Sequence, residues 1–266
     1  MADEAVLLDV DDDGVATLTL NRPDNRNALS EPVSSGIVEK LDELESRNDV
    51  RCLVVTGSGG SFCAGGDVNS MMELMSDVVP LHEAVRRIQD QTSRAIQRVH
   101  DFYLPTVAKI DGFAYGAGAN LALACDVQVM NEEAFVSFGF RQVGLGVDTG
   151  TSYFLPRAVG SNTAKELVFT GENVDAERAV DIGLVNHAFP DETFEADVAE
   201  FVEKIASGPT VGLRASKQAL ARGFERSIDD AMAFEAAAQA AVFESDDHTE
   251  GATAFMEKRS PEFEGK

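Results

Sequence analysis

Two stretches rich in glycine and alanine, with a backbone nearly bare of side chains, are the parts of this sequence whose residue types could do chemistry. One reads SFCAGGDV at residues 61–68, and the other reads DGFAYGAGANLALACD at residues 111–126. Glycine-rich loops often bind phosphate through G-x-G-x-x-G or G-x-x-x-x-G-K-[ST]. Gly116 and Gly118 fit the start of the first pattern, but Leu121 stands where its third glycine belongs, and neither stretch contains the Gly-Lys pair of the second. The usual nucleotide-binding fingerprints are therefore absent from both loops.

An oxyanion hole is another use for such loops. Each loop is expected between a buried strand and a helix, where two backbone N–H groups can hold the negative charge that develops on a carbonyl oxygen. The small residues at 64–66 and 116–118 let a substrate approach the main chain. A helix that starts near Ala117 adds the positive end of its dipole. Taken singly, each loop is more simply explained as a tight turn without a ligand.

The surrounding pattern predicts the elements that must position these loops. Apolar runs at 6–10 and 15–20, around an Asp-Asp-Asp-Gly turn, predict a hairpin. Ser30 is a suitable N-cap for the amphipathic stretch that follows. The order strand, glycine loop, helix then occurs twice, at 53–75 and 107–124. This order is typical of an irregular ββα superhelix, although periodicity alone also permits a doubly wound sheet.

The C-terminal part of the chain is predicted to be mostly helical from Asp197 onward. A last helix is expected to begin after a Thr249 cap and to end before Pro261. The alanine-rich face at 231–241 permits close contact between helices. It fits either a seam between copies of the chain or a helix pair within one copy.

The charge of the chain excludes some functions. Forty-six acidic residues stand against 22 basic ones, for a net charge of −24 and a pI near 4.4. Nucleic acid is an unsuitable partner, because phosphate contacts need a basic face. The acids are dispersed, and lysines are few, seven against 15 arginines. This favours a halophilic protein, since screening within about 3 Å at 1 M salt removes self-repulsion; an acid-rich protein from an ordinary cytoplasm is the alternative.

Other features indicate a cytoplasmic protein without a metal. No segment approaches the roughly 18 uninterrupted apolar residues that span a membrane, and the acidic start MADEAVLLDV lacks the basic residues of a signal peptide. Cys52, Cys63 and Cys125 have no C-x-x-C spacing and are expected to be buried thiols in a reducing compartment. The four histidines show no metal-ligand spacing. We therefore expect no metal and no separate cofactor.

An ordered set of motifs resembles one enzyme superfamily, that of crotonase, or enoyl-CoA hydratase/isomerase. The resemblance covers nearly the whole chain, because the two bare loops are accompanied by NRPDNRNALS (21–30), GLGVDTGTSYFLPRAVG (144–160), GENVDAERAVDIGLVNHAFP (171–190) and AFMEKRSPEF (254–263). It implies an α/β fold with a spiral ββα core and acyl-CoA site over residues 1–200. It also implies a helical trimerisation region over residues 201–266 and a coenzyme A thioester as substrate.

The resemblance implies roles for single residues. Gly66 and Ala117 occupy the positions of the two N–H donors of the oxyanion hole. Asp67 and the backbone beside it would contact the adenine side of the ligand. Lys258, with Phe255 packed beside it, would reach the nucleotide of a neighbouring copy in a trimer or a dimer of trimers. The expected substrate contacts are Arg22, Arg26, Ala28, Ala64, Asp67, Val68, Gly118, Asn120, Phe140, Gln142, Phe255 and Lys258.

The side chains that would select the reaction differ from those of a hydratase. Hydratases of this superfamily use two glutamates to position and activate water, and at those positions stand Asn120 and Gln142, whose amides do not titrate. Asp148 corresponds to the single catalytic acid of some Δ3,Δ2-enoyl-CoA isomerases and of the ring-epoxide isomerases of phenylacetyl-CoA breakdown. One carboxylate suffices for a 1,3-proton shift, because it can remove a proton at one carbon and return it two carbons away.

Asp148 has two interpretations. An apolar surround made by Phe140, Val143, Leu145 and Val147 would raise its pKa toward a useful value. Alternatively, Asp148 caps the helix that follows, since Asp-Thr-Gly-Thr-Ser is also good capping sequence. The resemblance favours an isomerase that uses Asp148. Enoyl-CoA hydration is the alternative, and a non-catalytic acyl-CoA-binding protein is a third possibility.

Overall fold

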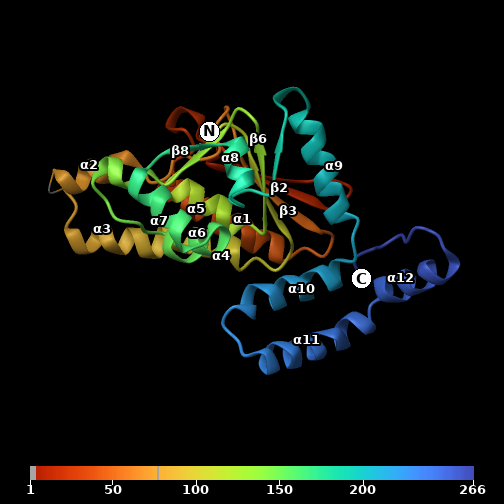
Figure 1. Ribbon diagram of the computed structural model, residues 1–266. Coiled ribbons are helices and arrows are strands. Elements are labelled where there is room, and N and C mark those ends of the chain that lie inside the picture. The colour runs from red at the N-terminus through yellow and green to blue at the C-terminus, as the bar shows by residue number, and fades with distance from the viewer. Residues whose placement is uncertain (1–3, 77) are drawn as a thin grey trace.

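A twisted sheet runs through the centre of the molecule. The computed structural model describes residues 4–76 and 78–266, apart from the side chains of residues 68–71 (Figure 1). Within these residues the main sheet has six strands in the order β1-β2-β3-β4-β6-β9. The first pair is the predicted antiparallel hairpin, and the other strands add to it in parallel. The strands are β1 (Val6–Val10), β2 (Val15–Leu20), β3 (Cys52–Gly57), β4 (Thr106–Ile110), β6 (Val127–Asn131) and β9 (His187–Phe189).

A smaller sheet decides between the two predicted architectures. Among the described residues it consists of β5 (Phe113–Tyr115), β7 (Phe135–Ser137) and β8 (Asn173–Asp175). The chain passes from β4 in the main sheet to β5 in the small one before it enters α5 (Ala117–Ala124). This is a turn of a ββα superhelix and not of a doubly wound sheet. The sequence did not predict β5, because three residues are too few to show a period.

Helices cover the sheets and continue into a C-terminal arm. α1 (Glu31–Glu45) begins after Ser30, as predicted, although the Ser30 side chain makes no capping hydrogen bond. Residues 81–100 form one nearly continuous helix, with a π-helical segment between α3 and α4. The other helices are α2 (Val68–Met75), α3 (Leu81–Arg87), α4 (Arg94–His100), α6 (Thr151–Val159), α7 (Ser161–Thr170), α8 (Ala176–Asp181), α9 (Phe194–Ala206), α10 (Thr210–Gly223), α11 (Ile228–Phe243) and α12 (Asp246–Glu257).

Both faces of the main sheet are buried, which explains the continuous apolar strands. In β3, Leu53 and Val55 belong to the large core that includes α1, α4 and α5. Cys52 and Val54 point to the opposite face, where they join a second core with α9. This alternation follows from the two-residue period of a strand. The cysteines are buried free thiols, as predicted, and burial raises the pKa of the Cys52 thiol to about 12.

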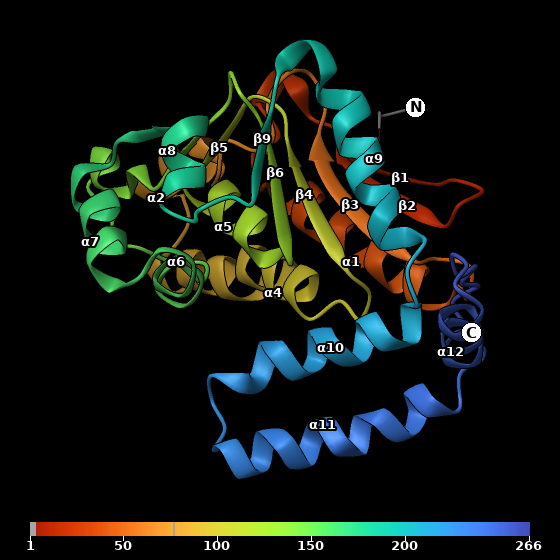
Figure 2. The same ribbon diagram turned by 45° about the vertical axis from the view of Figure 1, so that its right-hand side comes forward.

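The C-terminal arm is an antiparallel pair, α10 and α11, followed by α12 (Figure 2). Lys217 of α10 fastens the arm to the core, because its Nζ donates to Leu104 O at 2.8 Å and pairs with Asp126 at 2.7 Å. α11 packs on α10 within the chain, as one of the two interpretations of the alanine face expects. Large apolar side chains of the arm, such as Leu220 and Phe224, are exposed. The seam between copies therefore stays a prediction.

The predicted start of the last helix is wrong. α12 begins at Asp246, and its N-cap is Ser245, whose side chain accepts a hydrogen bond from His248 N at 3.1 Å. Thr249 lies inside the helix. The sequence ESDDH contains a stronger signal than Thr249, because two aspartates follow the serine in the first turn, where they favour the helix dipole. Within the described residues, no helix is both long and apolar enough to span a membrane.

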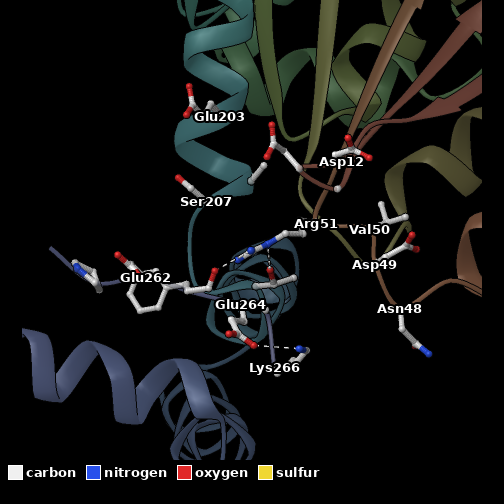
Figure 3. A pocket seen from close by; sticks show the side chains of 17 residues that line it. Asp12, Asn48, Asp49, Val50, Arg51, Glu203, Ser207, Glu262, Glu264 and Lys266 are labelled. Carbon is white, nitrogen blue, oxygen red and sulfur yellow. Dashed lines mark hydrogen bonds and ion pairs between the residues drawn. The ribbon is translucent and has the colours of Figure 1, made fainter.

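Arg51 holds the C-terminal tail against the core. Its guanidinium donates to Phe263 O and Gly208 O at 2.8 Å each and to Thr210 Oγ1 at 3.3 Å, and Figure 3 shows it at the centre of the surrounding side chains. Three acceptors around one planar group use the fixed fork of donors that arginine provides. The α1–β3 connection, the α9–α10 corner and the tail are therefore fixed by one side chain.

We expect Arg51→Lys to destabilise the protein. Lysine keeps the charge but loses the fork, so the free energy of unfolding should fall by about 1–3 kcal/mol. Denaturant unfolding followed by circular dichroism measures this. Arg47→Lys is the matched control, because Arg47 pairs with the exposed carboxylate of Asp49. Equal stability of the Arg51→Lys protein and the wild type would contradict the role given to Arg51.

Candidate active site

The loop between β3 and α2 is held between two other backbone segments. On one side, Cys63 pairs with Ala114 of β5 in a parallel bridge, and Tyr115 N donates to Cys63 O at 2.9 Å. On the other side, Leu29 N donates to Gly65 O at 2.8 Å. The two predicted glycine loops therefore lie next to each other, in fixed register.

Glycine is required where the two loops touch. A Cβ atom on Gly65, whose φ is +91°, would lie 2.5 Å from Tyr115 O and 3.3 Å from Ala117 N. A Cβ atom on Gly118 would lie 2.3 Å from Cys63 O. A side chain at either position would force the two backbones apart. The bare backbone thus has a structural cause, since it brings Gly65 against the first turn of α5.

Two amide donors remain unused at this contact. Ala117 is the first residue of α5, so its N–H has no acceptor within the helix. The parallel bridge between Leu29 and Gly66 uses the Gly65 carbonyl and leaves the Gly66 amide out. Among the hydrogen bonds between described residues, none is donated by the Gly66 or the Ala117 amide. Two free donors on adjoining loops, at the positive end of a helix, are the parts of an oxyanion hole.

Phe140 lies beside these donors. It belongs to the 3-10 segment Gly139–Val143, and it is 8% exposed. Its Cζ atom would lie 3.8 Å from a Cβ atom on Gly116, the residue that precedes α5. The ring therefore provides an apolar wall next to the start of the helix, as expected for a residue that contacts an acyl group.

Asp148 is the carboxylate on the loop that leads into α6. Burial raises its pKa, and the Thr149 hydroxyl, which donates to Oδ1 at 3.1 Å, lowers it by a smaller amount. The interpretation of Asp148 as a helix cap is wrong, because the N-cap of α6 is Gly150 and no side chain caps that helix. The Asp148 carboxylate is therefore not used to start a helix.

The predicted apolar surround of Asp148 is mostly wrong. Val143, Leu145 and Val147 are 61%, 47% and 39% exposed. They lie at the end of the 3-10 segment or in the irregular loop after it, where no packed element covers them. Of the four candidates only Phe140 is buried. Burial nevertheless raises the pKa of Asp148, which is itself half-buried.

Asn120 joins Asp148 to the start of α5. It is completely buried, and its Nδ2 donates to Thr149 Oγ1 and Thr151 Oγ1 at 2.8 Å each and to Asp148 O at 3.1 Å. Its Oδ1 is buried without a partner among the described residues. Since Asn120 lies on the first turn of the helix that Ala117 begins, the Asp148 loop is held one helical turn from the oxyanion donors.

Gln142 belongs to a different network. Its Oε1 accepts a hydrogen bond from Tyr115 Oη at 2.8 Å, and its Nε2 donates to Gly171 O at 2.9 Å. Both ends of the amide are therefore occupied by protein groups. Asn120 and Gln142 are thus both amides whose side chains are hydrogen-bonded to other protein groups.

The nucleotide-binding candidates of the N-terminal part lie beside the β3–α2 loop. Ala64 N donates to Arg26 O at 2.9 Å, which pairs the two segments. The side chains of Arg22 and Arg26 are exposed, and neither forms an ion pair with another described residue. Ala28 is buried and Asp67 is half-buried. Val68 begins α2, but its side chain lies outside the described residues.

The two C-terminal candidates are not brought to this site within one chain. Phe255 lies near the end of α12, and Lys258 follows that helix. Both views place α12 in the arm, well away from α5 (Figures 1 and 2). Phe255 is 86% exposed. Contact with the nucleotide of a neighbouring copy stays a prediction.

Asn27 is a site residue that the sequence reasoning missed. It is completely buried at φ +56°. Its Oδ1 accepts from Arg22 N at 2.9 Å, and its Nδ2 donates to Ser58 O and Ser61 O at 2.9 Å and 2.8 Å. It fixes the Arg22 segment against the β3–α2 loop. The available signal was an asparagine in a turn, since asparagine tolerates left-handed backbone and bonds to nearby main chain.

A cavity at the base of the C-terminal arm is separate from these loops. It has a volume of about 820 Å³ and is lined by the hairpin turn, residues 48–51, the end of α9 and the tail (Figure 3). Asp12, Asp49, Glu203, Glu262 and Glu264 make its lining acidic, which does not suit the phosphates of a nucleotide. Within the described residues, no cluster of three or more His, Cys, Asp or Glu side chains could hold a metal ion.

The fold and the site together define a class of enzyme. Two backbone donors beside the start of α5 can stabilise negative charge on a carbonyl oxygen, and a half-buried carboxylate, on a loop that bonds to the first turn of that helix, can move a proton. This combination suits reactions that pass through the enolate of a thioester.

Comparisons with known proteins identify the family. The sequence model of the Enoyl-CoA hydratase/isomerase family matches residues 11–266. The short-chain-enoyl-CoA hydratase of Clostridium acetobutylicum is 34% identical over 251 residues, 93% of each chain. The 1,2-epoxyphenylacetyl-CoA isomerase of Escherichia coli is 34% identical over 254 residues, 95% of this chain and 96% of that one. The crystal structure of an enoyl-CoA hydratase from Bacillus anthracis has a TM-score of 0.91 at 28% identity and covers 98% of this chain and 100% of that one.

The chain therefore belongs to the enoyl-CoA hydratase/isomerase, or crotonase, superfamily, and it is an enzyme of that superfamily. The resemblance drawn from the sequence motifs is confirmed, and so is the expected crotonase fold.

We expect Gly118→Ala to disable the site. The added Cβ atom would lie 2.3 Å from Cys63 O and separate the two loops, so turnover of an acyl-CoA substrate should fall about 100- to 1,000-fold, the effect of losing one oxyanion donor. Gly223→Ala is the matched control, because a Cβ atom there meets nothing within 4 Å. Circular dichroism checks that both variants fold. Unchanged turnover by folded Gly118→Ala would refute the loop contact as the basis of the site.

Proposed function

We propose that this enzyme is an enoyl-CoA isomerase that moves a proton between two carbons of its substrate. The observation that carries the proposal is the set of side chains around α5. Asp148 is the carboxylate there, with a pKa raised by burial. Asn120 and Gln142, at the positions of the two hydratase glutamates, are amides that are hydrogen-bonded to protein groups.

The proposed reaction needs one acid. The Gly66 and Ala117 amides bind the thioester oxygen of a 3-enoyl-CoA. The Asp148 carboxylate takes a proton from C2, and the electron pair passes to the thioester oxygen as a dienolate that the two amides stabilise. The protonated carboxyl then returns the proton to C4, which leaves the conjugated 2-enoyl-CoA. A raised pKa suits this shuttle, because the group must accept and release the same proton.

The proposed ligand contacts follow the charges near the site. Arg22 and Arg26, exposed and without ion pairs among the described residues, are suited to the phosphates of coenzyme A. In a protein of net charge −24, such local positive charge is needed to hold an anion. In a trimer or a dimer of trimers, Phe255 and Lys258 would add contacts to the nucleotide of a neighbouring copy.

Enoyl-CoA hydration is the second candidate. It is favoured by the 34% identity to the hydratase of Clostridium acetobutylicum, equal to that of the Escherichia coli isomerase. Hydration needs an activated water, and neither amide side chain can accept its proton at neutral pH. We therefore place isomerisation first.

Two substrates separate these reactions. We expect the enzyme to convert 3-enoyl-CoA to the conjugated 2-enoyl-CoA, with a gain of absorbance. We expect it not to hydrate trans-2-enoyl-CoA. Absorbance of both substrates, followed in dilute and in concentrated salt, measures this. Rapid loss of the conjugated absorbance from the 2-enoyl substrate would establish hydration and refute the proposal.

Asp148→Asn should abolish isomerisation and keep acyl-CoA binding. The amide cannot shuttle a proton, so kcat should fall about 100- to 10,000-fold. The Kd for the acyl-CoA, measured by calorimetry, should change little. In the wild type the rate should decline as the pH falls through the raised pKa of Asp148, since the base is then protonated. Asp111→Asn, on the loop after β4, is the control for a lost charge. Turnover by Asp148→Asn would contradict the assignment.

We propose that the acidic surface makes the enzyme salt-dependent. Self-repulsion at a net charge of −24 is screened as the Debye length falls from about 10 Å at 0.1 M to about 3 Å at 1 M salt. The thermal unfolding midpoint should therefore rise between these KCl concentrations. Scanning calorimetry at a series of KCl concentrations tests this. A midpoint that is constant or lower at 1 M would refute adaptation to salt.

A further inference from the structure

Four residues around the start of α6 form a closed hydrogen-bond network. Asn120 Nδ2 donates to Thr149 Oγ1 and to Thr151 Oγ1 at 2.8 Å each. Thr149 Oγ1 donates to Asp148 Oδ1 at 3.1 Å, and Thr151 Oγ1 donates to Asp148 O at 3.0 Å. Asn120, Thr149 and Thr151 are 0%, 8% and 2% exposed, so water does not replace these partners.

The count of donors fixes the direction of each bond. A threonine hydroxyl has a single proton. Thr149 uses its proton on the Asp148 carboxylate, and Thr151 uses its proton on the Asp148 carbonyl. Both hydroxyls then accept from Asn120 Nδ2, whose two protons are shared among three acceptors because Asp148 O lies 3.1 Å from the same nitrogen. The asparagine amide supplies such a donor, whereas an ionised glutamate or aspartate only accepts and would draw the hydroxyl protons away from Asp148.

The backbone at Thr149 depends on the same contacts. Its φ is +46°, a left-handed conformation that is uncommon for a residue branched at Cβ. The hydrogen bonds from Asn120 on one side and to Asp148 on the other hold the side chain of this residue in place. The loop is thus held in an unfavourable conformation that directs the Thr149 hydroxyl at the carboxylate.

We infer that Asn120 and Thr149 are positioning residues for Asp148. They act through the chain of hydrogen bonds from Asn120 to the Thr149 hydroxyl and on to the Asp148 carboxylate, which we call the relay. Asn120 orients the Thr149 hydroxyl, the hydroxyl occupies Oδ1, and Oδ2 is left as the oxygen that exchanges the proton with substrate. The inference rests on the proposed isomerase. It goes beyond it by explaining why residue 120 is an amide, since the same side chain that cannot serve a hydratase is required for the relay.

Other charged groups near this loop do not replace the relay. α5 carries no charged residue. On α6, Arg157 stacks on Tyr153 and lies 3.8 Å from Glu225. On α4, His100 packs edge-on against Tyr153 and Phe154. α7, which packs on α6, carries Lys165 and Glu166. The pKa of Asp148 responds to burial and to the Thr149 hydroxyl.

Thr149→Val and Asn120→Asp test the relay through the pH profile of kcat/KM for 3-enoyl-CoA. Valine keeps the shape of threonine without the hydroxyl. The new carboxylate of Asn120→Asp turns the hydroxyl proton away from Asp148. Each change removes a hydrogen bond that favours the charged form, so the acid limb of the profile should move to higher pH, and kcat should fall about 10- to 100-fold with little change in KM. Thr149→Ser, which keeps the hydroxyl, should leave the acid limb where the wild type has it.

Thr163→Val on α7 is the control for a lost threonine hydroxyl away from the site. An acid limb at the wild-type pH in both Thr149→Val and Asn120→Asp, with Asp148→Asn inactive, would overturn the relay and leave the isomerase intact. Turnover by Asp148→Asn would overturn both. If Thr149→Val fails to fold at its left-handed position, Thr149→Ala against Thr149→Ser decides the question, because neither variant adds a charge that would by itself raise the pKa of Asp148.

Discussion

The close contact between two glycine-rich segments of main chain sets the geometry of this site. At Gly65 and Gly118 the backbones of the β3–α2 loop and of α5 approach so closely that a Cβ atom would overlap a carbonyl oxygen of the other segment. Hydrogen bonds on both sides of the β3–α2 loop keep it there, through β5 and through the segment before α1. Because the contact is between main chains, the positions of the two free amides are set by the fold itself, which gives a preorganised pair of donors.

The superhelix explains why this contact exists. A ββα unit brings the chain from the main sheet through the short strand β5 into α5, and the loop after β3 pairs with that same strand. The adjoining pair of free amides is therefore a product of the topology, while the proposed reaction depends on side chains of the same helix and its neighbours.

Those side chains make a consistent set. Asn120 satisfies two threonine hydroxyls whose protons are already used, and Gln142 is held by Tyr115 and Gly171. Both threonine hydroxyls are satisfied in this way, while Asn120 Oδ1 is buried without a partner among the described residues. A carboxylate in place of Asn120 would compete with Asp148 for the proton of the Thr149 hydroxyl. Asn120 is thus part of a hydrogen-bond network with Asp148, and Gln142 belongs to a separate one.

Much of the architecture was readable from the sequence alone. The hairpin, the buried strands and the bare loops follow from local periodicity and turn chemistry, and the motifs indicated the superfamily. Only the tertiary structure decided what depends on contacts distant in sequence. Val143, Leu145 and Val147 are apolar but exposed, whereas Asp148 is half-buried and its backbone oxygen bonds to Asn120, which lies 28 positions earlier in the chain. Asn27 and β5 matter only through their partners. Local pattern specifies elements, whereas burial and hydrogen-bond partners are properties of the assembled fold.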